Sequence, residues 1–296
     1  MTTMPQKMQF KASVPPNIPK LQQNHRTILI TGCSSGIGLC CAHGMRARGW
    51  QVAATARKPP DLDRLRKEGL AAFYLDYADS DSIRRCVDQV LEQTGGGLYA
   101  LFNNGAFAQP GAVEDLAPNV LRAQFETNLF GWHDLTCRVI PTMRANGSGR
   151  IVQCSSVLGL VAMPFRGAYV AAKFALEGLS DVLRHELAGS GIFVSLIEPG
   201  PIRSRLVEHA MEAFKRNIDI ENSVHSETYK RRIEFFQEGG SHRFKLGPEA
   251  VLKRLVHAVE SSRPKPHYYL TVPTYFAVLC RRLLPNRVID RIMERQ

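Results

Sequence analysis

Short runs of apolar and β-branched residues alternate along this chain with longer stretches in which apolar residues recur every three or four positions. Runs without helical spacing predict strands buried on both faces of a parallel sheet, and the periodic stretches between them predict helices. The expected strands cover 27–31, 50–56, 71–76, 98–102, 150–155, 193–198 and 268–271. This alternation predicts an α/β fold with a doubly wound parallel sheet of about seven strands.

The length of 296 residues suits one hydrophobic core with an extension at each end. The proline-containing, acid-free start predicts a mobile basic tail. The expected organisation is a tail over 1–26, one domain over 27–272 with a helical lid over 205–245, and a basic amphipathic tail over 273–296.

A glycine turn follows the first predicted strand, with Gly32, Gly36 and Gly38 leading into an apolar helix. Glycines let the backbone turn sharply and approach a ligand closely, and the free N–H groups of a helix start attract phosphate. Such a turn can also be only a tight strand-to-helix connection with no ligand. Other motifs in the chain are needed to distinguish this from a phosphate-binding turn.

Tyr169 is the only tyrosine with a lysine four residues downstream, Lys173. Residues at this spacing share a helix face, so the ammonium is expected beside the phenol. Lowering the phenol pKa from about 10 to 7 takes about 4 kcal/mol. One cation about 4 Å away supplies roughly that amount at an effective dielectric constant of 20, before desolvation. Tyr169 is therefore a candidate acid/base, with Ser156 upstream to bond a substrate oxygen.

These motifs together resemble the short-chain dehydrogenase/reductase family, in particular its retinol and 17β-hydroxysteroid dehydrogenase branch and bacterial NADP-dependent aldehyde reductases. The resemblance covers about 27–271 and includes T-G-C-S-S-G-I-G, N-L-F-G around Asn128, Y-V-A-A-K and I-E-P-G-P-I-R. It implies a Rossmann-type fold, hydride transfer to or from a nicotinamide, and a catalytic set of Asn128, Ser156, Tyr169 and Lys173. In that set the asparagine bends its helix and holds a water on the proton path.

The resemblance also implies where the dinucleotide binds. The expected cofactor residues are Gly32, Ser34, Ser35, Gly36, Ile37, Gly38, Arg57, Lys58, Asp76, Asn103, Gly105, Tyr169, Lys173, Pro199, Gly200, Ile202 and Ser204. One motif departs from the family pattern, because Asn103-Asn104 is followed by Gly105-Ala106 in place of A-G. The backbone path there is open at this stage.

The end of the second predicted strand distinguishes the two nicotinamide cofactors. Ala56 stands where an acid would hold a ribose hydroxyl, and Arg57 and Lys58 follow it. Because an arginine makes charge-assisted bonds to phosphate, the sequence favours NADP(H) over NAD(H).

Apolar residues surround the predicted reaction centre, and no arginine is evident that would bind a carboxylate. The expected substrate contacts are Ser156, Val157, Leu158, Phe165, Tyr169 and Phe107. We therefore expect reduction of a hydrophobic aldehyde or ketone, aliphatic, retinoid or steroid-like, or oxidation of the matching alcohol, with no metal. The alternative is a catalytically silent NADP-binding regulatory or scaffold protein.

Charge and cysteine content indicate which partners and which cellular compartment to expect. The net charge of +11 is concentrated at the two ends, without the interleaved aromatics of a nucleic-acid surface. Seven scattered cysteines lack metal-ligand spacing and indicate a reducing cytoplasm. The basic C-terminal stripes are open to two interpretations, contact with an anionic membrane surface or packing on the domain or on a partner of a homodimer or homotetramer.

Overall fold

The computed structural model describes residues 26–237 and 244–293. The predicted mobile tail therefore lies outside the described residues except for Arg26, as does 238–243 of the predicted lid. Among the residues described, no helix is both long and apolar enough to cross a lipid bilayer.

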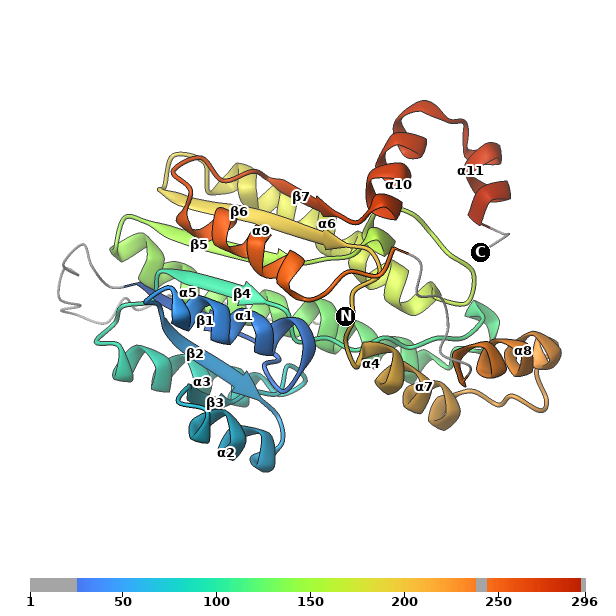
Figure 1. The fold of residues 1–296 in the computed structure, drawn as a ribbon, viewed down its shortest axis with the longest axis horizontal. Helices are drawn as coiled ribbons and strands as arrows, with labels where there is room; N and C mark the ends of the chain where they lie inside the picture. Colours follow the sequence, from blue (N-terminus) through green and yellow to red (C-terminus); the bar gives the residue numbers. More distant parts are fainter. Residues whose placement is uncertain (1–25, 238–243, 294–296) are drawn as a thin grey trace, which may run out of the picture.

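Seven parallel strands form one sheet in the order β3-β2-β1-β4-β5-β6-β7, which confirms the predicted fold class (Figure 1). The strands are β1 (Thr27–Ile30), β2 (Gln51–Ala56), β3 (Ala71–Tyr74), β4 (Ala100–Asn103), β5 (Gly149–Cys154), β6 (Ile192–Pro199) and β7 (His267–Leu270). The chain reverses its direction of travel across the sheet between β1 and β4. The carboxyl ends of strands at such a switch point are where open α/β sheets bind ligands.

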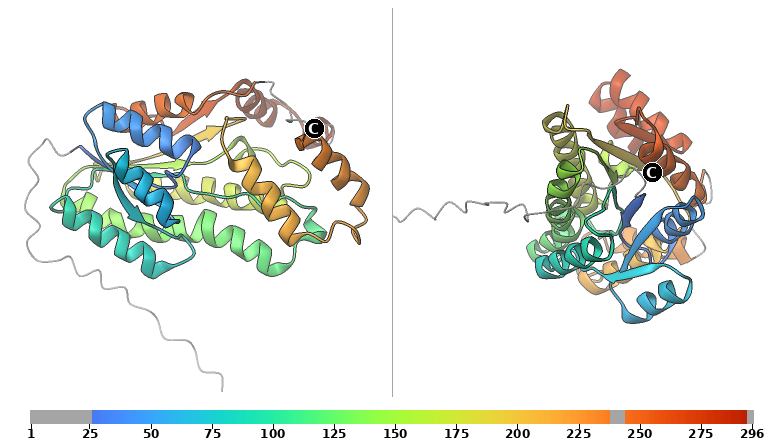
Figure 2. Two further views of the ribbon diagram at one scale, coloured as in Figure 1. Left: turned by 60° about the horizontal axis from the view of Figure 1, so that its bottom comes forward. Right: turned by 90° about the vertical axis from the view of Figure 1, so that its left-hand side faces the viewer.

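Helices cover both faces of the sheet, with α1 and α9 on one face and α3, α5 and α6 on the other (Figure 2). The helices are α1 (Gly36–Ala47), α2 (Pro59–Lys67), α3 (Ser80–Gln93), α4 (Pro118–Phe125), α5 (Gly131–Ala145), α6 (Gly167–Glu186), α7 (Leu206–Asn217), α8 (Ser226–Gln237), α9 (Glu249–Glu260), α10 (Val272–Leu283) and α11 (Asn286–Met293). The last two, with α7 and α8, lie beyond the carboxyl ends of the strands (Figure 1).

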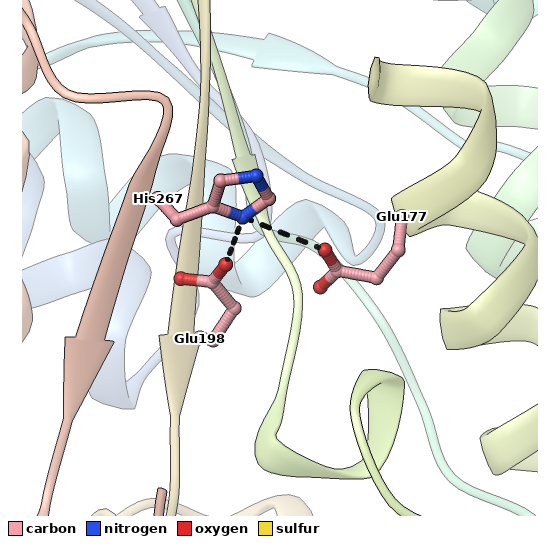
Figure 3. A group of neighbouring side chains, drawn as sticks. All are labelled: Glu177, Glu198 and His267. Atoms are coloured by element: carbon pink, nitrogen blue, oxygen red, sulfur yellow. Dashed lines mark hydrogen bonds and ion pairs between the residues drawn. The ribbon is translucent and has the colours of Figure 1, made fainter. Parts of the chain in front are cut away.

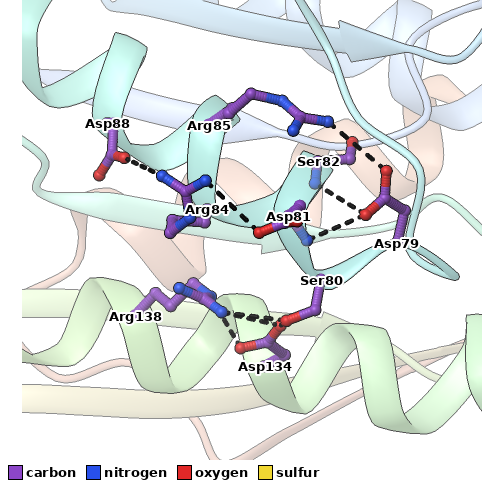
Figure 4. A network of polar contacts seen from close by, with 9 residues as sticks. All are labelled: Asp79, Ser80, Asp81, Ser82, Arg84, Arg85, Asp88, Asp134 and Arg138. Atoms are coloured by element: carbon purple, nitrogen blue, oxygen red, sulfur yellow. Dashed lines mark hydrogen bonds and ion pairs between the residues drawn. The ribbon is translucent and has the colours of Figure 1, made fainter.

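The start of α3 shows how local sequence fixes a helix on this scaffold (Figure 4). Asp79 caps the helix, because its carboxylate accepts hydrogen bonds from two backbone N–H groups of the first turn. Ser80 then donates to Asp134 on α5 at 2.6 Å, and Arg138 donates to the same carboxylate at 2.7 Å. These polar contacts set the register of α3 against α5.

The chain around Asn128 is not one continuous α-helix. Between α4 and α5 the chain forms one π-helical turn, η2 (Glu126–Phe130), which holds Asn128 fully buried. Single π turns occur mostly at functional sites. Asn128 therefore lies in a turn wider than that of an α-helix.

Candidate active site

The glycine turn after β1 is closed by backbone contacts that leave no room for side chains. A Cβ on Gly38 would lie 2.2 Å from the Gly32 carbonyl oxygen, and a Cβ on Gly32 would lie 2.5 Å from the Gly105 Cα. Gly32 and Gly36 also have φ angles of 68° and 55°, which favour glycine. The turn thus brings the N-terminus of α1 to the carboxyl edge of the sheet.

The loop after β4 is held against this turn by the hydroxyl of Thr31. The backbone N–H groups of Asn104 and Gly105 donate to Thr31 Oγ1 at 2.8 and 3.0 Å. The fully buried Asn103 lies below them, and the Tyr77 hydroxyl donates to its side-chain oxygen at 2.7 Å. The Asn103–Ala106 segment, which departs from the family pattern, therefore places Gly105 where the loop after β4 touches the glycine turn. The backbone of this segment packs directly against the turn.

Two adjoining clefts run along this edge and share Gly32, Ser34, Gly105, Ala106 and His209 in their walls. Of the expected cofactor residues, the first cleft collects Gly32, Ser34, Ser35, Gly36, Ile37, Gly105, Tyr169, Lys173, Pro199, Gly200, Ile202 and Ser204. The second adds Arg57 and Asp76. Together they form an elongated groove that passes the start of α1, which has no acidic residue in its first turn. The shape and the unblocked helix terminus fit a dinucleotide.

Three expected cofactor residues stand apart from the walls of these clefts. Asn103 is fully buried below the loop after β4, and Gly38 packs against the Gly32 carbonyl oxygen. Lys58 precedes the first turn of α2, a helix that the sequence analysis did not anticipate, and is exposed.

Ser156, Tyr169 and Lys173 line the first cleft together. Ser156 precedes the short turn η3 (Val157–Gly159), and its hydroxyl accepts a hydrogen bond from the Leu158 N–H at 3.1 Å. Tyr169 and Lys173 lie one turn apart on α6, as expected from their spacing.

Lys173 is fully buried beneath the phenol. Its ammonium donates to the Cys154 carbonyl at 2.7 Å and lies 4.2 Å from the centroid of the Trp132 ring, compared with 5.7 Å for the Tyr169 ring. Burial lowers the pKa of Lys173 to about 8. Trp132 is a neighbour that the sequence analysis did not connect with the site, because nothing in the spacing of α5 relates it to α6.

Burial raises the pKa of the Tyr169 phenol, and the neighbouring Ser156 offsets only part of the rise. This is opposite to the direction predicted from Lys173 alone. The largest cause of this higher pKa is desolvation, because the phenol is almost completely buried, and the neighbouring Cys154 adds to it. The Lys173 ammonium, for its part, is directed at a backbone carbonyl. In this structure Tyr169 is therefore a protonated group at neutral pH.

Asn128 bonds to the loop after β4. Its side-chain oxygen accepts from the Phe107 N–H at 3.2 Å, and its amide nitrogen donates to the Phe107 carbonyl at 2.8 Å. Both contacts satisfy a polar group buried in a helix. The implied role of Asn128 on a proton path stays a prediction.

The expected substrate residues separate into different places. Leu158 packs with Tyr169 and with Leu206 of α7 beside the reaction centre, whereas Val157 is half-buried in η3. Phe107 lines the cleft that contains Arg57, and Phe165 packs under the lid helices. The sequence analysis also missed Leu206 and His209, which reach the first cleft from the lid.

Three ionisable side chains meet two turns beyond Tyr169 along α6: the buried Glu177 of α6, the buried Glu198 of β6 and the half-buried His267 of β7 (Figure 3). His267 Nδ1 is 2.7 Å from Glu198 Oε1 and 3.9 Å from Glu177 Oε2. Their ligand atoms lie within 4.8 Å of one another, but the short bond uses the imidazole nitrogen that a metal would need. We interpret the group as sharing protons.

Each member of this cluster has a raised pKa. Burial raises the pKa of Glu177 to about 8 and also raises the pKa of Glu198. The hydrogen bond to Glu198 raises the pKa of His267. The folded cluster thus keeps protons that the unfolded chain releases at lower pH.

Residues 26–214 match the sequence pattern of the family described as short chain dehydrogenase. The chain belongs to this family. It is 42% identical over 269 residues to the uncharacterized oxidoreductase YbbO of Escherichia coli (strain K12), a match that covers 91% of this chain and 94% of that protein. A short-chain dehydrogenase from Streptomyces avermitilis has a similar structure, with a TM-score of 0.75 and 29% identity over 92% of this chain and 96% of that one.

Two further relatives of this short-chain dehydrogenase have names that describe an activity. Retinol dehydrogenase 8 of Bos taurus is 34% identical over 256 residues, covering 81% of this chain and 79% of that protein. The NADPH-dependent 3-dehydrocapnine reductase of Ornithobacterium rhinotracheale is 28% identical over 275 residues, covering 90% and 95%. The resemblance inferred from the motifs is therefore confirmed at the level of the family.

The cluster predicts how stability depends on pH. Because the folded pKa values are raised, its contribution to stability is greatest below the unfolded values and falls as the pH rises toward 8. Glu177→Gln should reduce the loss of unfolding free energy between pH 5.5 and 8 by about 1–3 kcal/mol, since one pKa unit corresponds to about 1.4 kcal/mol. Urea unfolding at both pH values measures this.

The matched control is Glu186→Gln, which changes an exposed carboxylate on the same helix. It should leave the pH dependence as in the unmodified protein. A Glu177→Gln protein with an unchanged pH dependence would show that the cluster does not hold protons as described.

Proposed function

We propose that this short-chain dehydrogenase is an NADP(H)-dependent reductase of lipophilic aldehydes or ketones. The observation that carries the proposal is the convergence of Ser156, Tyr169 and Lys173 on the cleft whose other wall is the glycine turn. A cofactor held by the turn and a carbonyl held by the serine and tyrosine would therefore lie in contact.

The nicotinamide cofactor, when bound, supplies the hydride for the carbonyl carbon. The matching proton for the carbonyl oxygen comes from the Tyr169 hydroxyl, and Ser156 bonds the same oxygen to fix its position. The phenol is protonated at neutral pH, and this is the form that donates a proton to a carbonyl oxygen. Developing negative charge on the substrate oxygen would be stabilised by both hydroxyl groups.

Lys173 supports the proton donor from below. With its pKa near 8, the amine exchanges a proton close to neutral pH. The Trp132 ring and the Cys154 carbonyl fix its position. In this arrangement the charge of the Lys173 ammonium would stabilise the phenolate that remains after Tyr169 has donated, until a proton from solvent restores the phenol.

The preference for NADP(H) is supported by the end of β2. Arg57 and Lys58 are exposed there and no carboxylate follows β2 directly, so a ribose 2′-phosphate would meet cations. Asp76 at the end of β3 approaches Arg57 at 4.0 Å and offsets part of its charge. The relative named as an NADPH-dependent reductase supports the same assignment.

A lipophilic substrate is supported by the side chains around the reaction centre. Leu158, Leu206 and Ile202 present apolar surface beside Tyr169. The similarity to a retinol dehydrogenase is consistent with such a substrate.

Replacing the proton donor should separate chemistry from cofactor binding. Tyr169→Phe removes one hydroxyl, so NADPH-dependent reduction of decanal should fall by about 10³-fold, within the usual range for general acid catalysis. NADPH affinity, measured by fluorescence titration, should change less than about threefold. Tyr74→Phe, on the edge strand β3, is the control. Unchanged turnover in Tyr169→Phe would exclude Tyr169 as the donor.

Reversing the charge after β2 tests the choice of cofactor. Arg57→Asp should weaken NADPH binding by about 10- to 100-fold, the loss expected for a charge-assisted bond, and should leave NADH binding unchanged or tighter. Lys67→Asp makes the same charge change on an exposed site at the end of α2 and should have little effect. Equal loss of both cofactors in Arg57→Asp would contradict phosphate recognition by Arg57.

A further inference from the structure

A third cleft lies under the lid helices α7 and α8, next to the reaction centre. Its walls are predominantly aromatic and aliphatic and also include two arginines: Pro110, Gly111, Phe165, Arg166, Met211, Phe214, Tyr229, Arg232, Ile233 and Phe236. Met211 and Phe214 come from α7, the helix whose first turn provides Leu206 to the catalytic cleft. Helix α7 therefore forms a wall of both the catalytic cleft and the third cleft.

Arg166 and Arg232 are half-buried in this third cleft. The guanidinium carbon of Arg232 lies 4.6 Å from the centroid of the Phe165 ring, and that of Arg166 lies 5.7 Å from the centroid of the Phe236 ring. Within 26–237 and 244–293, neither side chain has a hydrogen-bond or ion-pair partner. Burial and the charge of Arg232 lower the pKa of Arg166.

Two carboxylates on the segment that follows Gly111 are engaged with other side chains. Asp115 accepts hydrogen bonds from the hydroxyls of Tyr229 and Ser223, and Glu114 pairs with His225 at 2.6 Å. Two like charges thus share an apolar cleft without a counter-charge from the described residues around them. Charges removed from water are normally paired, so this arrangement is suited to an anion that comes from outside the chain.

The position of Arg166 relates this charge to the reaction centre. It lies three residues before Tyr169, immediately before α6 begins. The Gly111 N–H donates to the Phe165 carbonyl at 3.0 Å and holds this segment against the chain that follows β4. An elongated molecule with one end at Tyr169 can therefore extend along α7 toward the two arginines.

We propose that the cleft between Arg166 and Arg232 binds an anionic oxygen group, a carboxylate, sulfonate or phosphate, at the far end of a lipophilic carbonyl substrate. The inference rests on the proposed function and defines its substrate class as amphipathic. The aromatic walls would pack on the alkyl chain, and the guanidinium groups would bond the terminal oxygens. No such arginine was expected from the sequence, because Arg166 and Arg232 are far apart in the chain and only the folded lid brings them together.

A matched pair of substrates tests this proposal. 12-Oxododecanoate and its methyl ester share the aldehyde and the chain and differ in terminal charge. NADPH oxidation should give a kcat/KM at least about 10-fold higher for the carboxylate, from hydrogen bonds to charged groups. Arg232→Gln should remove the preference through a higher KM for the carboxylate while leaving the ester unchanged. Arg231→Gln, the exposed neighbour on α8, should keep the preference.

Equal kcat/KM for the two substrates would overturn the subsite and leave the reductase activity standing. If neither aldehyde is reduced, the proposed function fails, and calorimetric titration with decanesulfonate then tests the subsite by itself. Binding that Arg232→Gln abolishes and Arg231→Gln retains would support an anion site. Equal binding by both variants, or none by the unmodified protein, would overturn it.

The large apolar side chains of α10 face away from the domain. Val272, Phe276, Leu279 and Leu283 follow the i, i+4, i+7, i+11 spacing of one helix face and are 61%, 50%, 55% and 70% exposed. The side turned to the domain carries the smaller Thr274, Ala277 and Cys280, all buried. These four side chains therefore do not pack on their own domain, which leaves a membrane surface or a partner subunit among the interpretations of the stripe.

Charge indicates what covers this face. Between 272 and 293 the chain has four arginines and only one acidic residue, Asp290. Arg281 is already tied to the domain, since it donates to the Leu160 carbonyl at 2.7 Å beside the catalytic cleft. The exposed Arg282, Arg287 and Arg291 remain for contact with a partner. A two-fold contact between copies would bring two such sets of arginines together.

We infer that the outer face of α10 and α11 binds an anionic phospholipid surface. The apolar stripe would enter the interface while the arginines bond headgroup phosphates, so that a lipophilic substrate reaches the cleft from the membrane. The two helices would lie on the bilayer, in agreement with their lengths.

Vesicle co-sedimentation tests the surface. The protein should pellet with vesicles of phosphatidylcholine containing about one-third phosphatidylglycerol, an anionic content that attracts basic segments, and not with phosphatidylcholine alone. Replacing Phe276, Leu279 and Leu283 together by Glu should abolish binding. Val224→Glu, at a site 85% exposed between α7 and α8, should retain it. Failure to pellet with either vesicle would overturn the inference, and a dimer-to-monomer change in the triple variant would assign the face to a second copy.

Discussion

The close backbone contact between the glycine turn and the loop after β4 is the constraint on which the site depends. Gly32 and Gly105 approach so closely that any side chain at Gly32 would collide with the neighbouring backbone. The hydroxyl of Thr31, the residue before this turn, accepts two backbone hydrogen bonds from the loop after β4. The contact closes the switch point of the sheet and aims α1 at the groove. Every cofactor contact proposed for this chain is positioned relative to it.

Helix α6 carries three buried ionisable groups, each one turn after the last. Tyr169 faces the cleft, Lys173 lies fully buried behind it, and Glu177 follows one turn later beside Glu198 and His267. Burial has opposite effects on these groups, because it favours the neutral form of each. It keeps the phenol and the carboxyl protonated and makes the amine easier to deprotonate. The desolvation that raises the pKa of Tyr169 is the same effect that makes the cluster sensitive to pH.

Much of this fold was predictable from the sequence, because buried parallel strands are apolar throughout and their helices carry clear periodicity. The spacing of Tyr169 and Lys173 fixed their shared helix face without knowledge of the fold. The direction of the Tyr169 pKa was wrong, since desolvation and the hydrogen bond of Lys173 to a backbone carbonyl depend on tertiary packing. Trp132, Arg166 and Arg232 were missed for a similar reason: their relation to the site arises only when distant segments pack together.

The central claim is that the chain transfers hydride from NADPH to a lipophilic carbonyl. The most direct measurement uses NADPH carrying two deuterium atoms at C4 of the nicotinamide, with decanal and the purified protein, followed by mass spectrometry of the product. The account predicts decanol with one deuterium on the carbon that bore the aldehyde. Absence of alcohol, or alcohol without deuterium at that carbon, would contradict it.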